Sequence, residues 1–568
     1  MPHIQSGQCL DDRKMKKTIV FLSYVLVAAS VCAQSLHDVS TQMGIFNRLY
    51  KTLDQYYVDT LNTERNFTTA IRAMLADLDP YTEYYDAASA REFSRVTTGK
   101  YAGVGAMIHY YKKEDRCVIY QLYEGKPAVT AGLRVGDVIL SVNGIDTGKK
   151  GTKPMADFVS SVSSALRGDA GTVAKVRVTR PGVTDTLEFN VTRANVQLPS
   201  VSYSGMVNDE TGYLALTSFT AGSAAEVGEA IKGLCALGAQ SVILDLRGNG
   251  GGLANEAVNL VNLFVPKGKL ILKMKGKFAD VNSSYATQSV PLFPDMPVVV
   301  LVNGQSASAS EITCGSLQDL DRGVVMGERT FGKGLVQQTH ELAEGTMLKL
   351  TTSHYYIPSG RCIQALDYAH RTDKGEAYRT PDSLTHVFYT EAGRPVRDGG
   401  GITPDVEVKG DTLPANLEYL CASDEFFDYV TGYCLDHDSI ALAKDFVVSD
   451  EDYDDFVRQV TASDFSPEYV SLKLVDRLHD MMKAEGMPKE TLDKVENLKK
   501  DMKPDMGEVL RRNKGAMKER LASAICDRYY YTAGIMENLL KGDKQVRAAA
   551  ELLADPMRYK AILSKPAK

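Results

Sequence analysis

The chain has 568 residues, of which 44% are apolar and 24% are charged, and a formal net charge of −7. Because domains contain roughly 100–200 residues, this length excludes a single core and predicts three or four domains. The composition is that of an ordinary globular protein, and the small, unclustered charge gives no electrostatic reason to expect a nucleic-acid partner.

The N-terminus has the features of a secretory leader. Three lysines within residues 14–17 precede an apolar run over residues 19–29, and small residues follow up to Ala33. This order predicts that residues 1–33 are a leader region with a signal peptide, that translation starts at Met15, and that cleavage follows Ala33. The protein is therefore expected to be periplasmic or otherwise exported. A retained membrane anchor is the alternative, although the apolar run is short for a bilayer.

The nine cysteines are scattered and predict no metal site. Seven remain once the leader is removed, and none of them forms a Cys-x-x-Cys pair or a cluster at zinc spacing. Cys421 and Cys434 could form a disulfide. The odd total leaves at least one thiol without an intramolecular partner.

Helices are predicted first in the chain, followed by short strands. In residues 34–97, apolar side chains recur at helical spacing, for example at Met43, Phe46 and Leu53. From residue 98 to residue 195, alternating β-branched residues between Gly and Asn turns predict a small β-rich domain.

The next region, residues 196–410, alternates strands with helices. Continuous apolar strands such as SVILD and PVVVLV each precede a turn and a helical pattern. This arrangement predicts a mostly parallel sheet with helices on both faces. Residues 411–568 are predicted to be helical, and their apolar stripes favour packing or self-association over chemistry.

A cluster of three serines lies between a predicted strand and a helix, in the stretch LVNGQSASASEI over residues 301–312. Serine is favoured as a helix cap, but one cap does not require three. A serine at this edge of an α/β sheet lies where ligands bind, and N–H groups at the helix start can hold an oxyanion. No G-x-S-x-G elbow is present, and no histidine is placed to form a triad.

The stretch GERTFGKG, Gly327–Gly334, nearly matches a phosphate-binding loop. The match fails because Gly334 stands where Ser or Thr is needed and because a strand, not a helix, is predicted to follow. A lysine between two glycines near a serine turn instead fits a Ser/Lys dyad, since burial lowers the pKa of a lysine and glycines allow close approach. A solvated turn lysine is the alternative.

The Gly-rich turn LDLRGNGGGL, residues 244–253, follows another apolar strand. Such a turn exposes backbone N–H groups to an anion. A nucleotide loop is the alternative, but the G-x-G-x-x-G register is missing. The turn fits an oxyanion donor for acyl transfer better.

Together these segments resemble the C-terminal processing peptidases, also called tail-specific proteases. The motifs occur in the order of the family: LDPYT, YAGVG, GDVILSVNG, DLRGNGGG, VNGQSASASEI, TFGKGLVQ, YYIPSGR and GITPD. The resemblance covers about residues 36–410. It implies a ClpP/crotonase-like mixed α/β peptidase core over residues 196–410, a PDZ domain inserted over residues 98–195, and helical N- and C-terminal regions.

The resemblance also implies the roles of individual residues. The middle serine, Ser308, corresponds to the nucleophile and Lys333 to its base, and Gln337 matches the glutamine that orients the lysine. The oxyanion hole corresponds to the N–H of Ala309 with that of Gly252 or Gly251, of which Gly252 aligns better. One departure is a glycine at position 250, where many members have proline.

In the PDZ domain, the YAGVG loop matches the segment that binds a terminal carboxylate. Its residues are Tyr101, Ala102, Gly103, Val104 and Gly105. Arg167 matches an arginine that links the PDZ and protease states in the family.

The resemblance implies a serine endopeptidase that needs no metal or cofactor, recognises protein C-terminal tails and cleaves near them through an acyl-enzyme. Its partners would be proteins or peptides with accessible tails, an adaptor protein, and a second copy bound through the helical termini. One alternative is a non-catalytic PDZ adaptor that only captures tails. Another is a Ser/Lys hydrolase of small amides or esters.

Overall fold

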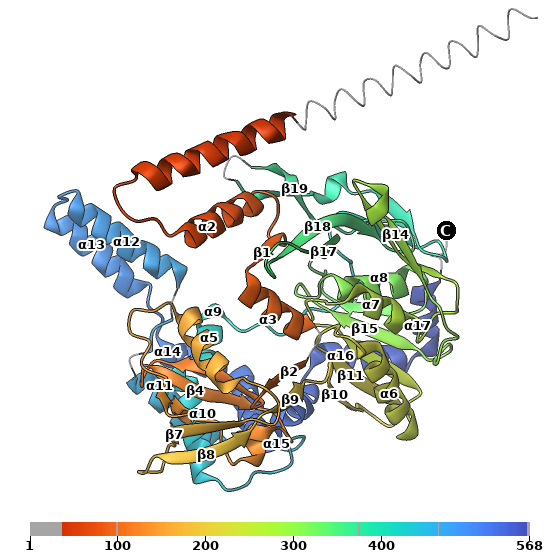
Figure 1. Ribbon diagram of the computed structural model, residues 1–568. Coiled ribbons are helices and arrows are strands. Elements are labelled where there is room, and N and C mark those ends of the chain that lie inside the picture. The colour runs from red at the N-terminus through yellow and green to blue at the C-terminus, as the bar shows by residue number, and fades with distance from the viewer. Residues whose placement is uncertain (1–36, 98–99, 373–374, 464, 468, 565–568) are drawn as a thin grey trace, which may run out of the picture. The chain divides into compact units, whose positions relative to one another are not determined.

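The computed structural model describes residues 37–97, 100–372, 375–463, 465–467 and 469–564 (Figure 1). The chain divides into two compact units, Met1–Tyr84 and Tyr85–Lys568. The leader and its cleavage site lie outside the described residues. Within the described residues, no helix is both long enough and apolar enough to cross a membrane.

The described residues of the first unit form two helices, over residues 37–56 and in α2 (Thr63–Ala76). Asn62 caps α2 by accepting a hydrogen bond from the Arg65 N–H at 2.9 Å. The rings of Tyr50 and Phe67 join the helices with centroids 4.4 Å apart. The prediction of helices alone was incomplete, because a short strand, β1 (Glu83–Tyr85), follows α2 and precedes α3 (Ala87–Thr97).

The β-rich region is an antiparallel sheet with two helices. The sheet order is β3-β4-β5-β7-β8, with β6 paired to β5, and a separate ribbon joins β2 to β9. Phe158 and Val162 of α5 are almost fully buried against inward-facing residues such as Val176. The elements are β2 (Lys100–Gly103), β3 (Ala106–Tyr111), β4 (Arg116–Leu122), α4 (Pro127–Thr130), β5 (Val138–Val142), β6 (Ile145–Asp146), α5 (Met155–Leu166), β7 (Val173–Thr179), β8 (Leu187–Thr192) and β9 (Ala194–Gln197).

The central sheet has the order β10-β11-β12-β15-β16-β23. All neighbours in it are parallel except the edge pair β10 and β11. The predicted mostly parallel sheet is therefore confirmed, and its apolar strands are buried on both faces. The strands are β10 (Val201–Met206), β11 (Thr211–Leu216), β12 (Ser241–Asp245), β15 (Val298–Val302), β16 (Val324–Gly327) and β23 (Val406–Glu407).

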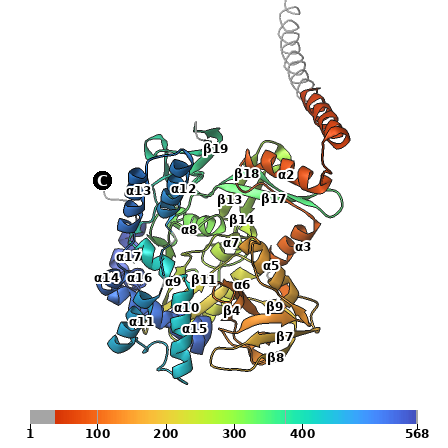
Figure 2. The ribbon, with the colours of Figure 1, turned by 90° about the vertical axis from the view of Figure 1, so that its left-hand side faces the viewer.

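Different helices cover the two faces of this sheet. Leu244 and Val300 point to the layer of α6 (Ser223–Ala236), α7 (Ala254–Val261) and α8 (Ala309–Asp319). Ile243 and Val299 point to the opposite layer, where the last helices of the chain, α16 (Lys544–Leu553) and α17 (Pro556–Leu563), lie. Helices more than 240 residues from β15 along the chain thus complete the core around it (Figures 1 and 2).

A second, antiparallel sheet contains β13 (Leu270–Gly276), β14 (Ser283–Ala286), β17 (Leu335–Glu341) and β18 (Met347–Tyr356). Two short ribbons follow it in sequence. They are β19 (Leu366–Arg371) with β20 (Ala377–Arg379), and β21 (Val387–Tyr389) with β22 (Pro395–Arg397).

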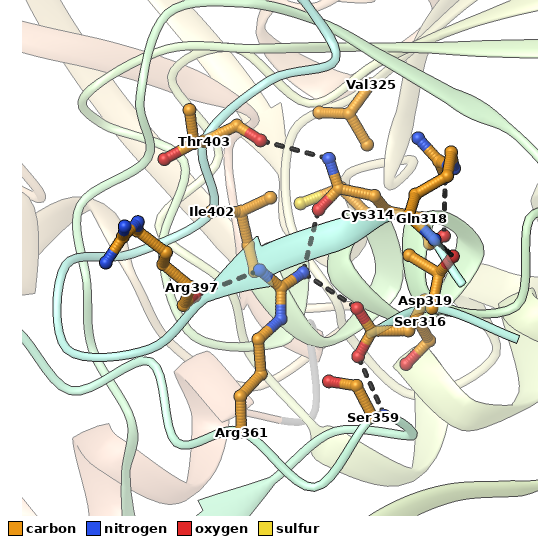
Figure 3. Close-up of polar contacts among 12 residues, drawn as sticks. Cys314, Ser316, Gln318, Asp319, Val325, Ser359, Arg361, Arg397, Ile402 and Thr403 are labelled. Atoms are coloured by element: carbon orange, nitrogen blue, oxygen red, sulfur yellow. Dashed lines mark hydrogen bonds and ion pairs between the residues drawn. The ribbon is translucent and has the colours of Figure 1, made fainter. Parts of the chain in front are cut away.

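Buried Arg361 joins the loop after β18 to the end of α8 (Figure 3). Its Nη2 lies 2.8 Å from Asp319 Oδ1 and donates to Gln318 Oε1 at 2.7 Å, while Nη1 donates to the Arg397 carbonyl at 3.1 Å. The Ser359 N–H donates to the other Asp319 oxygen. The pair Arg361–Asp319 therefore fixes one end of the helix that begins at the serine cluster.

The C-terminal region divides by its packing. The helices α9, α10, α11, α14 and α15 form a core of their own around Tyr453, Phe456 and Leu521. In Figure 2, α10 and α15 lie beside β4, and the Phe427 ring stacks on Tyr120 with centroids 5.5 Å apart. The bounds are α9 (Ala415–Cys421), α10 (Asp424–Asp436), α11 (Asp450–Ala462), α12 (Val470–Ala484), α13 (Lys489–Asp501), α14 (Met506–Arg512) and α15 (Lys514–Leu540). Cys421 and Cys434 are both free thiols, so the disulfide considered from the sequence is not formed.

We expect Arg361→Met to destabilise the protein by about 3–5 kcal/mol, because it leaves the buried Asp319 carboxylate without its cation. Equilibrium urea unfolding measures this loss. In the control Arg458→Met, a pair exposed to solvent is broken, which costs less than about 1 kcal/mol. Equal losses in the two variants would contradict the structural role of Arg361.

Candidate active site

The serine cluster follows β15 at the carboxyl edge of the central sheet, and two of its three hydroxyls are used for structure. Ser306 Oγ donates to the Leu246 carbonyl at 2.8 Å, and Ser310 Oγ donates to the Asn249 carbonyl at 2.9 Å. Both serines are fully buried. Of the three serines, only Ser308 is partly exposed, so it is the one that solvent reaches.

Ser308 has an unusual backbone conformation, with φ 55° and ψ −111°. A residue with a side chain in such a region is strained by roughly 1–3 kcal/mol and persists only where its surroundings hold it. Here the carbonyl of Ser308 accepts hydrogen bonds from the Ile312 N–H at 2.9 Å and the Tyr355 hydroxyl at 3.2 Å. The Ser308 N–H donates to Glu311 Oε2 at 2.9 Å.

Glu311 is the centre of the site. Its buried carboxylate accepts four hydrogen bonds, two on each oxygen. The donors are Thr330 Oγ1 (2.6 Å) and Gly332 N (2.8 Å) to Oε1, and Ser308 N and Lys333 N (both 2.9 Å) to Oε2. The carboxylate therefore binds the serine turn and the lysine turn at once.

The lysine turn is held close to the serine turn by this arrangement. Because the backbone nitrogens of Ser308 and Lys333 bind the same oxygen atom, they are no farther apart than twice 2.9 Å. The flanking glycines are needed for space. A Cβ on Gly332 would lie 2.5 Å from the Cβ of Ala365, and a Cβ on Gly334 would lie 2.7 Å from the Gln364 nitrogen. The side chain of Lys333 is partly buried.

The electrostatics of Glu311 reflect its burial. Removal from water raises the pKa of its carboxyl from 4.5 to about 7, although hydrogen bonds from Thr330 and from the N–H groups of Lys333, Gly332 and Ser308 lower it. The residue thus gains or loses its charge near neutrality. Burial also raises the pKa of Tyr355 well above its ordinary value, so this hydroxyl remains a hydrogen-bond donor.

The Gly-rich turn lies against the same serine. A Cβ on Gly251 would lie 2.9 Å from both the Ala309 nitrogen and the Ser308 Cβ. The Gly251 N–H is already used, because it donates to Asn249 Oδ1 at 2.9 Å. In the described part of the chain, the N–H groups of Ala309, Gly250 and Gly252 have no hydrogen-bond acceptor. Of the two glycines considered from the sequence, only Gly252 has an N–H group available to an oxyanion.

Gln337 lies in β17, four residues after Lys333. Its amide Nε2 donates to Thr351 Oγ1 on the neighbouring strand at 3.2 Å. A register shift between Val336 and Gln337 occurs at this point of the ladder. Gln337 therefore lies on a strand and not on a loop. Its role in orienting Lys333 remains a prediction.

The five residues of the predicted carboxylate loop do not all lie in the same environment. Residues Tyr101, Ala102 and Gly103 pair with β9. Val104 and Gly105 instead line a pocket of about 480 Å³ together with β3, α5 and Arg167. Gly105 has φ 75°, and a Cβ there would lie 2.4 Å from the Lys126 Cβ, so no other residue fits. The pocket is also lined by residues 198–200 and by Thr217, Ser218 and Thr220, which adjoin strands β10 and β11 of the central sheet.

Among the described residues, no group of three or more His, Cys, Asp or Glu side chains is placed to hold a metal ion.

Sequence reasoning missed several residues that hold the site. Glu311 was detectable, because Ser308-x-x-Glu311 is the pattern of a capping box and the Glu311 half of that box is formed. Asn249, Thr330 and Tyr355 carried no such local signal, because their partners lie far away in the sequence.

Comparisons with known proteins identify three regions of the chain. Residues 210–369 match peptidase family S41, residues 118–180 match a PDZ domain, and residues 417–553 match the C-terminal helical domain of a probable PDZ-protease. The carboxy-terminal-processing protease of Bartonella bacilliformis is 31% identical over 363 residues, which cover 62% of this chain and 81% of the relative. The carboxy-terminal processing protease CtpA of Bacillus subtilis is 32% identical over 355 residues, covering 60% and 73%. A solved structure, the photosystem II D1 C-terminal processing protease, is 28% identical, with coverage of 66% and 91% and a TM-score of 0.35.

We expect Glu311 to make stability fall as pH rises. The folded state holds its proton up to about pH 7, whereas the unfolded chain releases it near 4.5. The contribution of Glu311 to the free energy of unfolding is therefore full below about pH 4.5. It falls by about 1.4 kcal/mol per pH unit above that and is lost by pH 7. Urea unfolding of wild type and Glu311→Gln from pH 4.5 to 8 measures it. The exposed Glu229→Gln variant should keep the wild-type slope. Identical slopes in wild type and Glu311→Gln would contradict the assignment.

Proposed function

Because the chain belongs to the carboxy-terminal processing proteases of peptidase family S41, we propose that it cleaves proteins near their C-termini with Ser308 as nucleophile and Lys333 as general base. One observation carries this proposal: the backbone N–H groups of both residues bind one oxygen of Glu311. This contact supports a dyad because it brings the serine turn after β15 and the lysine turn after β16 together at Glu311 Oε2.

In the proposed reaction, neutral Lys333 accepts the proton of the Ser308 hydroxyl as Oγ attacks the peptide carbonyl. A bond forms between Oγ and the carbonyl carbon, and the carbonyl oxygen becomes an oxyanion between the N–H groups of Ala309 and Gly252. Protonated Lys333 then gives its proton to the leaving amine. Water attacks the resulting ester, with Lys333 again as base, and releases the substrate fragment.

The PDZ domain supplies the recognition of the tail in this proposal. Among the described residues, β3 is an edge strand that pairs with β4 alone, so a peptide can add to its other edge. Its terminal carboxylate would meet the Val104–Gly105 turn, and its last side chain would enter the pocket between β3 and α5. The lining residues Ser218 and Thr220 flank Phe219, whose N–H donates to the carbonyl of Gly251 in the Gly-rich turn at 3.0 Å. The pocket is thus next to the proposed oxyanion site.

Export and self-association belong to the same proposal. N-terminal sequencing of the exported protein should begin at Gln34. Self-association would use the apolar stripe of α12, where Val470, Leu474, Leu478 and Met481 are each about half exposed or more.

We expect Ser308→Ala and Lys333→Met each to reduce cleavage of an unstructured peptide with a free C-terminus by at least about 10⁴-fold, because neither half of a dyad acts alone. Mass spectrometry of the fragments measures the rate. The exposed Ser204→Ala variant on β10 should retain full activity.

The amidated form of the same peptide separates the alternatives. Slower cleavage of the amide than of the free acid supports recognition of the tail carboxylate. Binding without cleavage by wild type would favour the tail-capturing adaptor. Turnover of small esters without peptide cleavage would favour the small-substrate hydrolase.

We expect a dimer by light scattering at micromolar concentration, because the stripe on α12 leaves a row of apolar side chains in water. Leu474→Glu with Leu478→Glu should give a monomer, whereas Lys494→Glu on α13 should not. A monomeric wild type would contradict the proposed interface.

A further inference from the structure

We propose that α16 supports catalysis through its cap Asp543 and its residue Gln545. Both act as positioning residues for the Gly-rich turn, residues 244–253, because they hold Arg247. This inference rests on the proposed function, because it assigns a role to the loop that carries Gly252. It extends that function to a helix that lies outside the residues matched to peptidase family S41.

Arg247 lies in the Gly-rich turn and is bound from two sides. On its own strand, Nε donates to both oxygens of Asp245, at 3.0 and 2.9 Å. From α16, Asp543 Oδ2 lies 2.8 Å from Nη2, and Gln545 Oε1 accepts from Nη1 at 2.7 Å. About a fifth of the Arg247 and Asp543 side chains is exposed, so water screens the pair only partly. A guanidinium held by several acceptors in this way has one orientation.

Asp543 has two separate functions, one for each oxygen. Oδ1 caps α16 by accepting from the N–H groups of Gln545 at 2.8 Å and Val546 at 3.0 Å, while Oδ2 is directed to Arg247. A cap needs only an acceptor of the Ser, Thr, Asn or Asp type. The second contact is therefore not explained by the stability of the helix.

Gln545 lies in the first turn of α16 and makes two further contacts. It is almost fully buried, and its Nε2 donates to the Val408 carbonyl at 2.6 Å while Oε1 accepts from Arg247. The N–H of Val408 in turn donates to the Gly327 carbonyl at the end of β16. Gln545 thus connects the Gly-rich turn with the strand end that precedes the lysine turn.

The helix itself is a rigid support. Val546, Ala549 and Leu552 are buried against the central sheet. Tyr213, fully buried in that same layer, donates its hydroxyl to Asp245 Oδ2 at 2.7 Å. Arg247 is thereby held between two elements that are fixed in one core.

The neighbours of Arg247 transmit its position to the nucleophile. The Leu246 carbonyl accepts from Ser306 Oγ, and the Gly248 N–H donates to Asn303 Oδ1 at 3.0 Å. The Asn249 carbonyl accepts from the Ala307 N–H at 3.0 Å and from Ser310 Oγ at 2.9 Å. A shift of Arg247 therefore moves the Gly-rich turn against the serine turn, and a displacement of about 1 Å in an active site costs roughly 100-fold in rate.

The test uses Asp543→Asn and Gln545→Met in the full-length enzyme. Asp543→Asn keeps the acceptor that caps α16 and removes the charge that binds Arg247, while Gln545→Met keeps the volume and removes both polar contacts. The control is Lys544→Ala, which lies between them and breaks only an exposed pair with Asp411. Kinetics are measured with the free-acid peptide and with a peptide aldehyde, whose adduct with serine places an oxyanion in the same site.

We expect kcat to fall roughly 10- to 100-fold in the double variant, with KM changed less than about twofold. Inhibition by the aldehyde should weaken by the same factor as kcat. Lys544→Ala should match wild type both in its kinetic constants and in its inhibition by the aldehyde. Unchanged kcat in the double variant, or an equal loss in Lys544→Ala, would overturn the proposal.

Amide hydrogen exchange separates this inference from the proposed function, because it does not require turnover. Exchange in residues 246–253 should be faster in Asp543→Asn than in wild type or Lys544→Ala. If wild type cleaved no peptide, the proposed function would fail while faster exchange would still support the link between helix and loop. Unchanged exchange would overturn that link whatever the activity.

Discussion

The carboxylate of Glu311 is the constraint on which the rest of the site depends. It joins the turn after β15 to the turn after β16, which would otherwise be separate loops at one edge of the sheet. Burying such a group costs several kcal/mol. Four donors offset this cost, since a hydrogen bond to a charged group contributes roughly 1.5–3 kcal/mol. The balance is close, which agrees with a pKa near neutrality. Neither turn can shift without leaving a buried oxygen or a buried N–H group without a partner.

The parallel sheet explains why these turns meet. Strands β11, β12, β15 and β16 run in the same direction, so the segments that follow them emerge along one edge. Buried hydroxyls and amides then fix the segments to one another: Ser306 and Ser310 connect the serine turn to the Gly-rich turn, and Asn249 donates to the Leu216 carbonyl of β11. The strained backbone of Ser308 is tolerated because so many contacts surround it. Its side chain is directed outward as a result, whereas its two neighbouring serines point inward.

The sequence predicted those features that depend on local patterns. Apolar strands such as SVILD alternate with helical patterns, and this is enough to predict the mixed α/β core. The strand after Lys333 was likewise predicted, and it separated this turn from a phosphate loop. Which serine of the three is presented to solvent depends on backbone conformation, so composition alone could not decide it. The short strand Glu83–Tyr85 was missed because three residues carry too little periodicity. The contacts of Asn249 with the Leu216 carbonyl, of Thr330 with Glu311 and of Arg247 with Gln545 join residues far apart in the chain, and a single sequence holds no record of them.

The position of α16 in the chain gives the proposed link a further consequence. The Gly-rich turn lies near residue 250, yet two of the side chains that hold Arg247 are added almost 300 residues later. The face of the sheet formed by Ile243 and Val299 also stays uncovered until α16 and α17 fold against it. Because chains fold from the N-terminus as they are made, the serine and lysine turns can form before the helix that orients the loop between them. Under the proposed function, an incomplete chain then has Ser308 in place but lacks a rigid oxyanion site. Peptidase activity then depends on completion of the whole fold, which separates the synthesis of the enzyme from its ability to cut other proteins.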